Sequence, residues 1–351
     1  MKEIISKLKI TGRTYFEDDT LWLCYSGSSV SFKMQGSYAG ITVKPDRYYK
    51  SYDKTMHARI AVYLNGTRVR DELIDNQTKT IVIETSAGHE SEIEVIKLSE
   101  CVMSLAGIAG IETDSDYIAP VPARKHRIEF IGDSITCGYG IDDECKDNTF
   151  STSTEDFTRA YAYKTAKLLD ADYSAVSISG CGIISGYTSD GKINTDQLLM
   201  PQYDFCGFSK PKDENDIMST FIRPQWDFSS FIPDAVVLFL GTNDYSYCKC
   251  DQKKCEDFED QYIKELIKIR KRNPSAVIFA CIGIMDSNLF GTILKAVNRF
   301  KSYTGDTSIY ALELPYHKNE DGYAADWHPT EKSNTRAAGV LSEYIRKIMK
   351  W

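Results

Sequence analysis

Four short segments, far apart in the chain, carry the residue types that an ester-hydrolysing site needs. In chain order they supply a nucleophilic hydroxyl, a glycine backbone N–H, a side-chain amide and an imidazole base. They are Gly132-Asp133-Ser134, Ser179-Gly180-Cys181-Gly182, Gly241-Thr242-Asn243-Asp244 and Asp326-Trp327-His328-Pro329. A serine hydroxyl is a poor nucleophile until a base takes its proton, so the sequence predicts that Ser134 and His328 work as a pair.

The first three segments each follow an apolar run that is typical of a buried strand. These runs are residues 128–131, 173–178 and 235–240. Catalytic groups collect at the carboxyl ends of parallel strands in an open α/β sheet, so we expect the segments to meet at one edge. At Ser134 the chain is predicted to turn from strand to helix, which brings the positive end of a helix near a developing oxyanion.

Two residues are expected to complete an oxyanion hole with the backbone N–H of Ser134. Gly180 offers a backbone N–H that a Cβ would keep away from the reacting carbonyl, and Asn243 offers its side-chain amide. Taken one at a time, glycine and asparagine at strand ends are more often simple turn residues. Their occurrence together with Ser134 and His328, in this order, favours the catalytic interpretation.

The chain has five histidines, and their positions in the sequence indicate which of them is the base. His57 and His89 lie in the amino-terminal half, His126 adjoins the first strand of the second half, and only His317 competes with His328 as the base. His328 is favoured because the two residues after it are predicted to begin a helix, which fixes the loop before it.

Two alternatives are open for the group that orients His328. Asp326, two residues upstream, can hold the imidazole and stabilise its protonated form. Otherwise Asp326 is a solvated loop carboxylate.

The composition is that of an ordinary globular protein and restricts the partners. The 351 residues include 42 basic and 50 acidic side chains, which gives a net charge of −8. A net-acidic surface argues against nucleic acid or an anionic membrane as the main partner. The longest apolar runs, 236–240 and 277–284, are far too short to cross a bilayer. We therefore predict a soluble, cytoplasmic protein, or a secreted one if a signal peptide has been removed.

Ten cysteines are many for a chain that is large enough to fold without a disulfide framework. Cys248, Cys250 and Cys255 follow a C-x-C-x₄-C spacing, with no C-x₂-C pair and no nearby histidine. Because that spacing differs from the usual zinc patterns, we expect reduced thiols there and no metal site. This cysteine usage favours a reducing compartment.

The two halves of the chain differ in the spacing of their apolar residues and predicted elements, and this difference predicts two domains. Residues 1–122 alternate with period two, and Asn65-Gly66 supplies a type I′ hairpin turn. This half is predicted to be an antiparallel β-sandwich of the jelly-roll kind. In residues 123–351 strands alternate with helical segments, as in a domain with a central parallel sheet. Helices are expected at about 257–272 and 332–349.

With these segments the sequence resembles the SGNH or GDSL-type hydrolases, a superfamily with Ser, Gly, Asn and His in four blocks. Ser134, Gly180, Asn243 and His328 correspond to those blocks in order. The stretches IGDSITCGYG and DGYAADWHP, together with the two rhythms, resemble carbohydrate esterase family 2 more specifically. Members of that family join a jelly roll to an SGNH domain, so the resemblance covers nearly the whole chain.

The resemblance implies removal of acetyl groups from sugars, often at the primary 6-hydroxyl, in xylan- or glucomannan-type oligosaccharides. It implies no metal or organic cofactor. Trp327, beside the base, is then a platform for a sugar ring, and Tyr139 and Trp226 are weaker candidates of the same kind. The sequence departs from many SGNH enzymes in one respect, because the position three residues before the histidine is Ala325 instead of aspartate. Asp326 in a rearranged loop, or a backbone carbonyl, must take that place.

The predicted reaction is a serine acyl-enzyme mechanism whose rate falls as His328 is protonated below neutral pH. Two other functions stay open. A short-chain lipid or thioester hydrolase would use the same residues, although no segment resembles an apolar lid. A catalytically weak glycan-binding protein is the third, and the presence of all four block residues argues against it.

Overall fold

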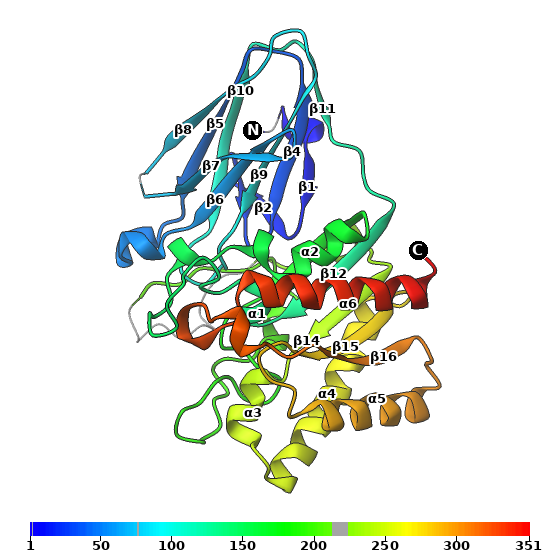
Figure 1. Cartoon of the computed structure of the whole chain (residues 1–351). Helices are drawn as coiled ribbons and strands as arrows, with labels where there is room; N and C mark the ends of the chain where they lie inside the picture. Colours follow the sequence, from blue (N-terminus) through cyan, green and yellow to red (C-terminus); the bar gives the residue numbers. More distant parts are fainter. Residues whose placement is uncertain (2, 76, 213–223) are drawn as a thin grey trace. The chain divides into compact units, whose positions relative to one another are not determined.

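The computed structural model describes residues 1, 3–75, 77–212 and 224–351, and in it the chain forms two compact units (Figure 1). The first comprises Met1–Ala123, Ser151–Phe157 and Phe205–Trp226. The second comprises Arg124–Phe150, Thr158–Asp204 and Asp227–Trp351. The expected division into 1–122 and 123–351 follows the main boundary but omits the two later segments that belong to the first unit.

The first unit is an antiparallel β-sandwich, as the alternating pattern predicts. Its strands are β1 (Lys9–Thr11), β2 (Thr14–Glu17), β3 (Thr20–Leu23), β4 (Ser29–Met34), β5 (Tyr38–Pro45), β6 (Arg59–Leu64), β7 (Thr67–Leu73), β8 (Lys79–Glu84), β9 (Ser91–Lys97), β10 (Ala106–Thr113) and β11 (Ile118–Pro120). One sheet has the order β1-β4-β9-β6-β7, with β11 also paired to β4, and the other has the order β2-β3-β10-β5-β8. Buried side chains from both sheets, such as Phe32 and Ile41, form one core.

The predicted hairpin turn joins β6 and β7. Asn65 and Gly66 have φ angles of 51° and 79°, the left-handed conformation that a type I′ turn requires at both central positions. The turn residues therefore specify the pairing of these two strands, as the sequence indicated.

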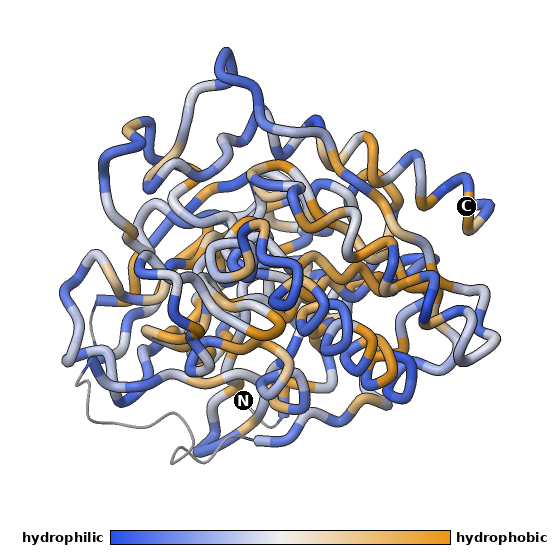
Figure 2. Tube along the Cα trace, turned by 90° about the horizontal axis from the view of Figure 1, so that it is seen from below, coloured by the Kyte–Doolittle hydropathy of each residue, from blue (hydrophilic) through white to orange (hydrophobic). Residues whose placement is uncertain are grey.

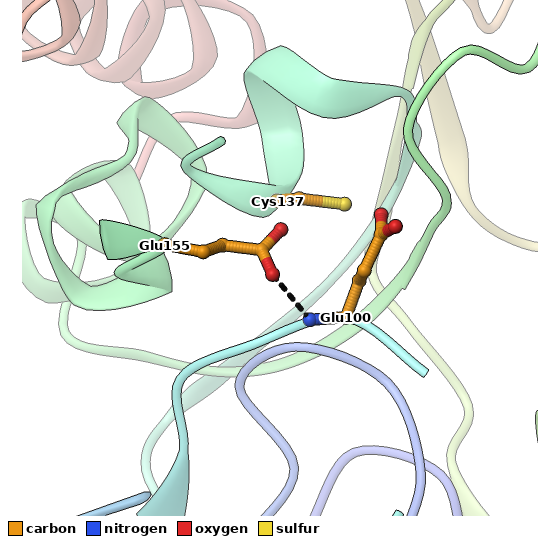
Figure 3. Close-up of side chains that lie close together, drawn as sticks. All are labelled: Glu100, Cys137 and Glu155. Atoms are coloured by element: carbon orange, nitrogen blue, oxygen red, sulfur yellow. Dashed lines mark hydrogen bonds between the residues drawn. The ribbon is translucent and has the colours of Figure 1, made fainter. Parts of the chain in front are cut away.

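The segment Ser151–Phe157 adds a buried carboxylate to the first unit. Glu155 accepts the backbone N–H of Glu100 at 2.8 Å (Figure 3), and the guanidinium of Arg59 donates to the Glu155 carbonyl at 3.2 Å. Burial, and next the nearby Glu100 carboxylate, raise the pKa of Glu155 well above its usual range. These long-range bonds attach to the sandwich a segment that the sequence assigned to the second domain.

The second unit is built on a parallel sheet, as the βαβ rhythm predicts. Its strands are β12 (His126–Gly132), β13 (Ala171–Ser177), β14 (Ala235–Phe239), β15 (Val277–Gly283) and β16 (Ile309–Leu314), in the order β13-β12-β14-β15-β16. The connections change direction between β12 and β14, and ligands of open α/β sheets bind beside the carboxyl ends of strands at such a switch point.

Helices cover both faces of this sheet (Figure 1). They are α1 (Ser134–Cys137), α2 (Tyr161–Leu168), α3 (Thr242–Cys248), α4 (Gln252–Arg272), α5 (Phe290–Thr304) and α6 (Glu331–Met349). α2 packs with α6 and α4 packs with α5. Along the helices hydrophobic and hydrophilic residues alternate within each turn, as expected for helices with one buried face (Figure 2). In the described part of the chain, no helix has both the length and the apolar character needed to cross a membrane.

Candidate active site

The turn from β12 into α1 presents Ser134 at the carboxyl edge of the sheet. Ser134 is the first residue of α1, and Asp133 caps the helix by accepting the N–H of Ile135 at 3.1 Å. The carbonyl of Asp133 also accepts the N–H groups of Thr136 and Cys137, each at 3.0 Å, so Asp133 fixes the start of the helix behind the serine. The strand-to-helix turn expected at the nucleophile is therefore present.

His328 lies in direct contact with Ser134. Its Nε2 is 2.8 Å from Ser134 Oγ, and its Nδ1 is 3.2 Å from the carbonyl oxygens of both Ala325 and Asp326. Carbonyl oxygens only accept hydrogen bonds, so the ring proton belongs on Nδ1, and Nε2 is left with the lone pair that accepts the serine hydroxyl. The arrangement is that of a nucleophile and its general base.

The environment keeps this imidazole neutral. Burial lowers the pKa of His328 to about 4, while the carbonyls of Ala325 and Asp326 partly oppose that effect. A base must be unprotonated to accept a proton, so a lowered pKa keeps His328 competent at neutral and mildly acidic pH.

The side chain of Asp326 takes a different place from the one expected of a triad acid. Its Oδ2 accepts a hydrogen bond from the Tyr139 hydroxyl at 2.5 Å, and none joins the carboxylate to His328. The reason is the backbone, because Asp326 has the left-handed angles φ 48° and ψ 39° and Trp327 has φ 61°. Of the two alternatives for orienting the base, the structure shows the backbone carbonyls.

Asn243 connects the three strand-end segments. It is the second residue of α3, directly after β14, and its Nδ2 donates to the Cys181 carbonyl at 2.9 Å and lies 3.3 Å from Asp133 Oδ2. Cys181 follows Gly180, and Asp133 precedes Ser134. Donation to a substrate oxygen would replace the longer of these two contacts.

Gly180 stands where the backbone needs a glycine. Its φ is 75°, a left-handed conformation that glycine adopts without steric cost. Its carbonyl accepts the N–H of Tyr187 at 2.9 Å, which closes the loop that follows. The expected reason for glycine was close approach to the substrate, and the structure adds a conformational one.

Asp244 braces the same loop from inside the protein. Its fully buried carboxylate accepts the backbone N–H groups of Ile183 at 2.9 Å, Ile184 at 2.7 Å and Ser185 at 3.1 Å. The loop packs so tightly that a Cβ on Gly182 would lie 2.7 Å from Asp244 Oδ2 and 2.0 Å from the Ser185 carbonyl oxygen. Asp244 thus fixes the segment that carries Gly180.

Two buried carboxyl groups behind the nucleophile have raised pKa values. Burial raises the pKa of Asp133 to about 7 and that of Asp244 to about 6, against the opposing effect of backbone N–H donors such as Ile135 and Ile183. The nearby carboxylate of Asp244 is a further cause that raises the pKa of Asp133.

The three aromatic candidates occupy different positions. Trp327 is 49% exposed beside the base, with the Lys146 ammonium 3.8 Å from its ring centre. Tyr139 stacks on His328, and this use of its ring differs from the expected sugar contact. Trp226 belongs to the first unit, where the Arg13 guanidinium lies 5.2 Å from its ring centre. A sugar-binding role for Trp327 or Trp226 stays a prediction.

His317, the rival base, points to another partner. Its Nδ1 is 3.0 Å from Ser333 Oγ, and its ring lies 4.3 Å from that of Tyr323. Burial lowers the pKa of His317 as well. His317 therefore contacts the Ser333 hydroxyl, whereas His328 is the imidazole in contact with Ser134.

Two of the three thiols of the C-x-C-x₄-C cluster lie near backbone carbonyls. Cys248 Sγ donates to the Lys254 carbonyl at 3.7 Å, and Cys255 Sγ donates to the Lys249 carbonyl at 3.8 Å. These are the contacts of ordinary thiols at the junction of α3 and α4.

Comparison with known proteins assigns the fold and the four segments to one family. Residues 130–334, more than half of the chain, match the GDSL-like Lipase/Acylhydrolase family. The protein belongs to this family. Residues 10–122 match the Carbohydrate esterase 2 N-terminal family, so the β-sandwich of this GDSL-like hydrolase also has a counterpart among known domains. The predicted superfamily and two-domain fold are confirmed.

The relatives of this GDSL-like hydrolase are esterases. The chain is 27% identical, over 97% of its length, to the cellulase/esterase CelE of Acetivibrio thermocellus, of which it spans 39%. It is 24% identical, over 98% of its length, to an acetylxylan esterase/glucomannan deacetylase of Cellvibrio japonicus, of which it covers 89%. A family two carbohydrate esterase from Clostridium thermocellum, solved in complex with cellohexaose, superposes with a TM-score of 0.84 at 26% identity, over 98% of this chain and 99% of that one.

The sequence assigned no role to two carboxylates of this GDSL-like hydrolase. Asp133 and Asp244 stand inside the predicted segments, each next to a predicted catalytic residue. That adjacency was the available signal, because a carboxylate beside a nucleophile or an oxyanion donor is costly to bury without a use. The three N–H partners of Asp244 lie 59 to 61 residues away, and the Asn243 amide lies 110 residues from Asp133, so these contacts are visible only in the fold.

Proposed function

We propose that this protein is a carbohydrate esterase that removes O-acetyl groups from sugars through an acyl-enzyme on Ser134. One observation carries the proposal: His328 Nε2, made basic by a protonated Nδ1 held at two carbonyls, lies 2.8 Å from Ser134 Oγ. The relatives named as esterases and deacetylases support the acetyl-sugar class. The proposed substrates are xylan- or glucomannan-type oligosaccharides, with the 6-O-acetyl group as the main target.

The first half of the reaction acylates the serine. Ser134 Oγ bonds to the acetyl carbon as His328 Nε2 takes its proton, and the carbonyl oxygen becomes an oxyanion. The backbone N–H groups of Ser134 and Gly180 and the amide of Asn243 are the proposed donors to this oxyanion. Removing one donor of this kind typically costs a factor of about 10²–10³ in kcat. The protonated His328 then gives its proton to the departing sugar oxygen.

The second half regenerates the enzyme. Water attacks the acetyl-Ser134 carbonyl while His328 Nε2 takes one of its protons. The second tetrahedral intermediate then collapses to acetic acid, which ionises to acetate in solvent, and Ser134 recovers its proton from His328. During both halves the imidazolium is stabilised by the Ala325 and Asp326 carbonyls on Nδ1. Asp326 therefore contributes through its backbone in this mechanism.

Trp327 is the proposed sugar platform. Half of its surface is exposed beside the base, and an indole face packs well against the C–H groups of a pyranose ring. The ammonium of Lys146 and the ring centre of Tyr323 lie 3.8 Å and 5.1 Å from the centre of the Trp327 ring and hold it in place.

A reducing, cytoplasmic compartment is proposed for this enzyme. All ten cysteines are free thiols in the structure, and three of them are not buried. Exposed free thiols persist more readily in reducing surroundings. Ten titratable thiols in protein purified from its natural source without reductant would support this, and fewer than ten would contradict it.

The test is acetate release from a panel of mono-acetylated sugars and acetylated oligosaccharides. We expect the wild type to release acetate with a preference for one position, and Ser134→Ala to lose at least about 10³-fold in kcat. Ser275→Ala, at an exposed turn, is the matched control and should keep wild-type turnover. Full activity in Ser134→Ala would exclude the acyl-enzyme mechanism.

A chain-length series separates this function from lipid or thioester hydrolysis. Nitrophenyl acetate should be cleaved faster than esters of longer acids, because the proposed substrates carry acetyl groups, whereas a lipid hydrolase acts on longer acyl chains. Cleavage of nitrophenyl acetate with no release from any sugar would retain the esterase and reject the carbohydrate substrate. Glycan binding without any hydrolysis would point to a binding protein.

A further inference from the structure

Tyr139 contacts the base and the residue that holds it. Its ring stacks on His328 with 4.0 Å between ring centres and on Phe150 with 4.4 Å. Its hydroxyl donates to Asp326 Oδ2 at 2.5 Å. A sugar could stack on this ring only by displacing one of its neighbours. The contacts of Tyr139 are therefore with the base and its loop.

The backbone before His328 needs to be held. Asp326 and Trp327 adopt φ angles of 48° and 61°, a left-handed conformation that is unfavourable for residues with a Cβ. Such backbone persists at functional sites only where surrounding contacts over-determine it. At Asp326 two such contacts exist, because its N–H donates to the Asn148 carbonyl at 3.0 Å and its carboxylate accepts from Tyr139.

This conformation determines what the base can do. In this backbone arrangement the Ala325 and Asp326 carbonyl oxygens lie 3.2 Å from His328 Nδ1, and they are the acceptors that keep the proton on Nδ1. If the loop relaxes, the neutral imidazole can carry its proton on Nε2, and that nitrogen can then no longer accept the proton of Ser134.

We propose that Tyr139 is a positioning residue that holds His328 in its catalytic tautomer and orientation. The hydroxyl fixes Asp326, so that two carbonyls stay on Nδ1, and the ring fixes the plane of the imidazole. This inference rests on the proposed roles of Ser134 and His328 as nucleophile and base. In this proposal the Asp326 carboxylate holds the loop before His328 in place.

The test is Tyr139→Phe, which keeps a ring to stack on His328 and removes the hydroxyl. We expect kcat on nitrophenyl acetate to fall about ten- to a hundred-fold, because small misplacement of a catalytic group is costly. KM should stay within about two-fold, since Tyr139 is not proposed to touch substrate. Asp326→Ala removes the other end of the same bond and should cost a similar factor.

A double-mutant cycle distinguishes a shared bond from two separate effects. If the hydroxyl and the carboxylate act through each other, Tyr139→Phe with Asp326→Ala should lose little more than either single variant. Additive losses would overturn the proposal. Tyr161→Phe is the matched control, because it removes a phenol hydroxyl 2.9 Å from Thr136 Oγ1 in the same unit without contacting His328. It should keep wild-type kcat.

A second measurement does not depend on activity. With ¹⁵N-labelled histidine, the nitrogen shifts of the five imidazoles report which ring nitrogen carries the proton. At pH 7 wild-type His328 should be protonated on Nδ1 alone, and Tyr139→Phe and Asp326→Ala should show a mixture of tautomers. Should Ser134-dependent hydrolysis be absent, the proposed function fails while this comparison still decides the role of Tyr139. An unchanged Nδ1 tautomer in both variants would overturn the inference.

Discussion

The two sides of Ser134 are held by carboxylates in different surroundings. On the oxyanion side, fully buried Asp244 gathers three backbone N–H groups of the loop after Gly180. On the base side, the half-buried carboxylate of Asp326 accepts one phenol hydroxyl and anchors a left-handed loop. The loop of the proposed oxyanion donor Gly180 is thus fixed from inside the protein, while the proposed base His328 is fixed by a loop that borders solvent.

The difference matches what each side must do. Oxyanion donors stabilise charge best when they are already in place and need no reorganisation, which a buried carboxylate with several N–H donors provides. The base gains and loses a proton in each half-reaction, so its pKa must stay low enough for it to be neutral between steps. Burial lowers the pKa of His328, and neutral carbonyls on Nδ1 oppose that effect less than a carboxylate in their place would.

Among the variants that separate the two sides, replacing Asp244 on the oxyanion side should lower kcat the most. In Asp244→Asn an amide N–H₂ replaces one of the oxygens that face Ile183 N–H, so the loop carrying Gly180 should shift. We expect kcat on nitrophenyl acetate to fall by a factor of about 10²–10³, as when an oxyanion donor is lost. Asp251→Asn is the matched control, because Asp251 caps α4 at an exposed position. Equal losses in the two variants would refute the special role of Asp244.

Adding a Cβ at Gly182, in the same loop, should lower kcat somewhat less. In Gly182→Ala the new Cβ would lie 2.0 Å from the Ser185 carbonyl oxygen, so the loop must move; we expect roughly a ten- to hundred-fold lower kcat and a lower Tm. Gly339→Ala is the control, because nothing lies within 4 Å of its Cβ in α6, and it should stabilise the fold by about 0.5–1 kcal/mol. A Gly182→Ala enzyme with wild-type kcat and Tm would show that the loop is not tight.

The pH profile examines the base side. His328 must be unprotonated to act, and burial lowers its pKa to about 4, so kcat/KM should stay high down to about pH 5. Below the pKa it should fall about ten-fold per pH unit as the base becomes protonated. The sequence placed this decline just below neutral pH. An acid limb near pH 6.5 would indicate a solvated imidazole, and one near pH 7 that disappears in Asp133→Asn would indicate titration of Asp133 instead.

The smallest expected effect comes from Asp326→Asn. The amide keeps an oxygen that can accept from Tyr139, and the backbone carbonyls on His328 remain, so kcat should fall less than about ten-fold. A triad acid changed to its amide typically costs about 10⁴-fold, because the imidazole then takes the wrong tautomer. A loss of that size, measured with nitrophenyl acetate, would restore the Asp326 side chain as the partner of His328.

The sequence was most informative where a structural element depends on the residue types within it. Apolar runs located β12, β13 and β14 to within a few residues, and Asn65-Gly66 located a hairpin. It was least informative where segments cross between units or where one carboxylate serves distant backbone. Nothing local to residues 151–157 or 205–226 indicates that they join the β-sandwich.

Residue type and order by themselves determined the reaction class of this protein. The sequence places a serine, two oxyanion donors and a histidine at the ends of predicted elements. These residues can meet only at one edge of a sheet, and parallel strands supply such an edge whatever the conformation of the loops. The tertiary structure alone decided which atoms hold the base. A left-handed turn at Asp326 sets carbonyls on His328 and sends the carboxylate to Tyr139, 187 residues earlier in the chain. That turn depends on contacts with distant residues, so the residues around Asp326 could not reveal it.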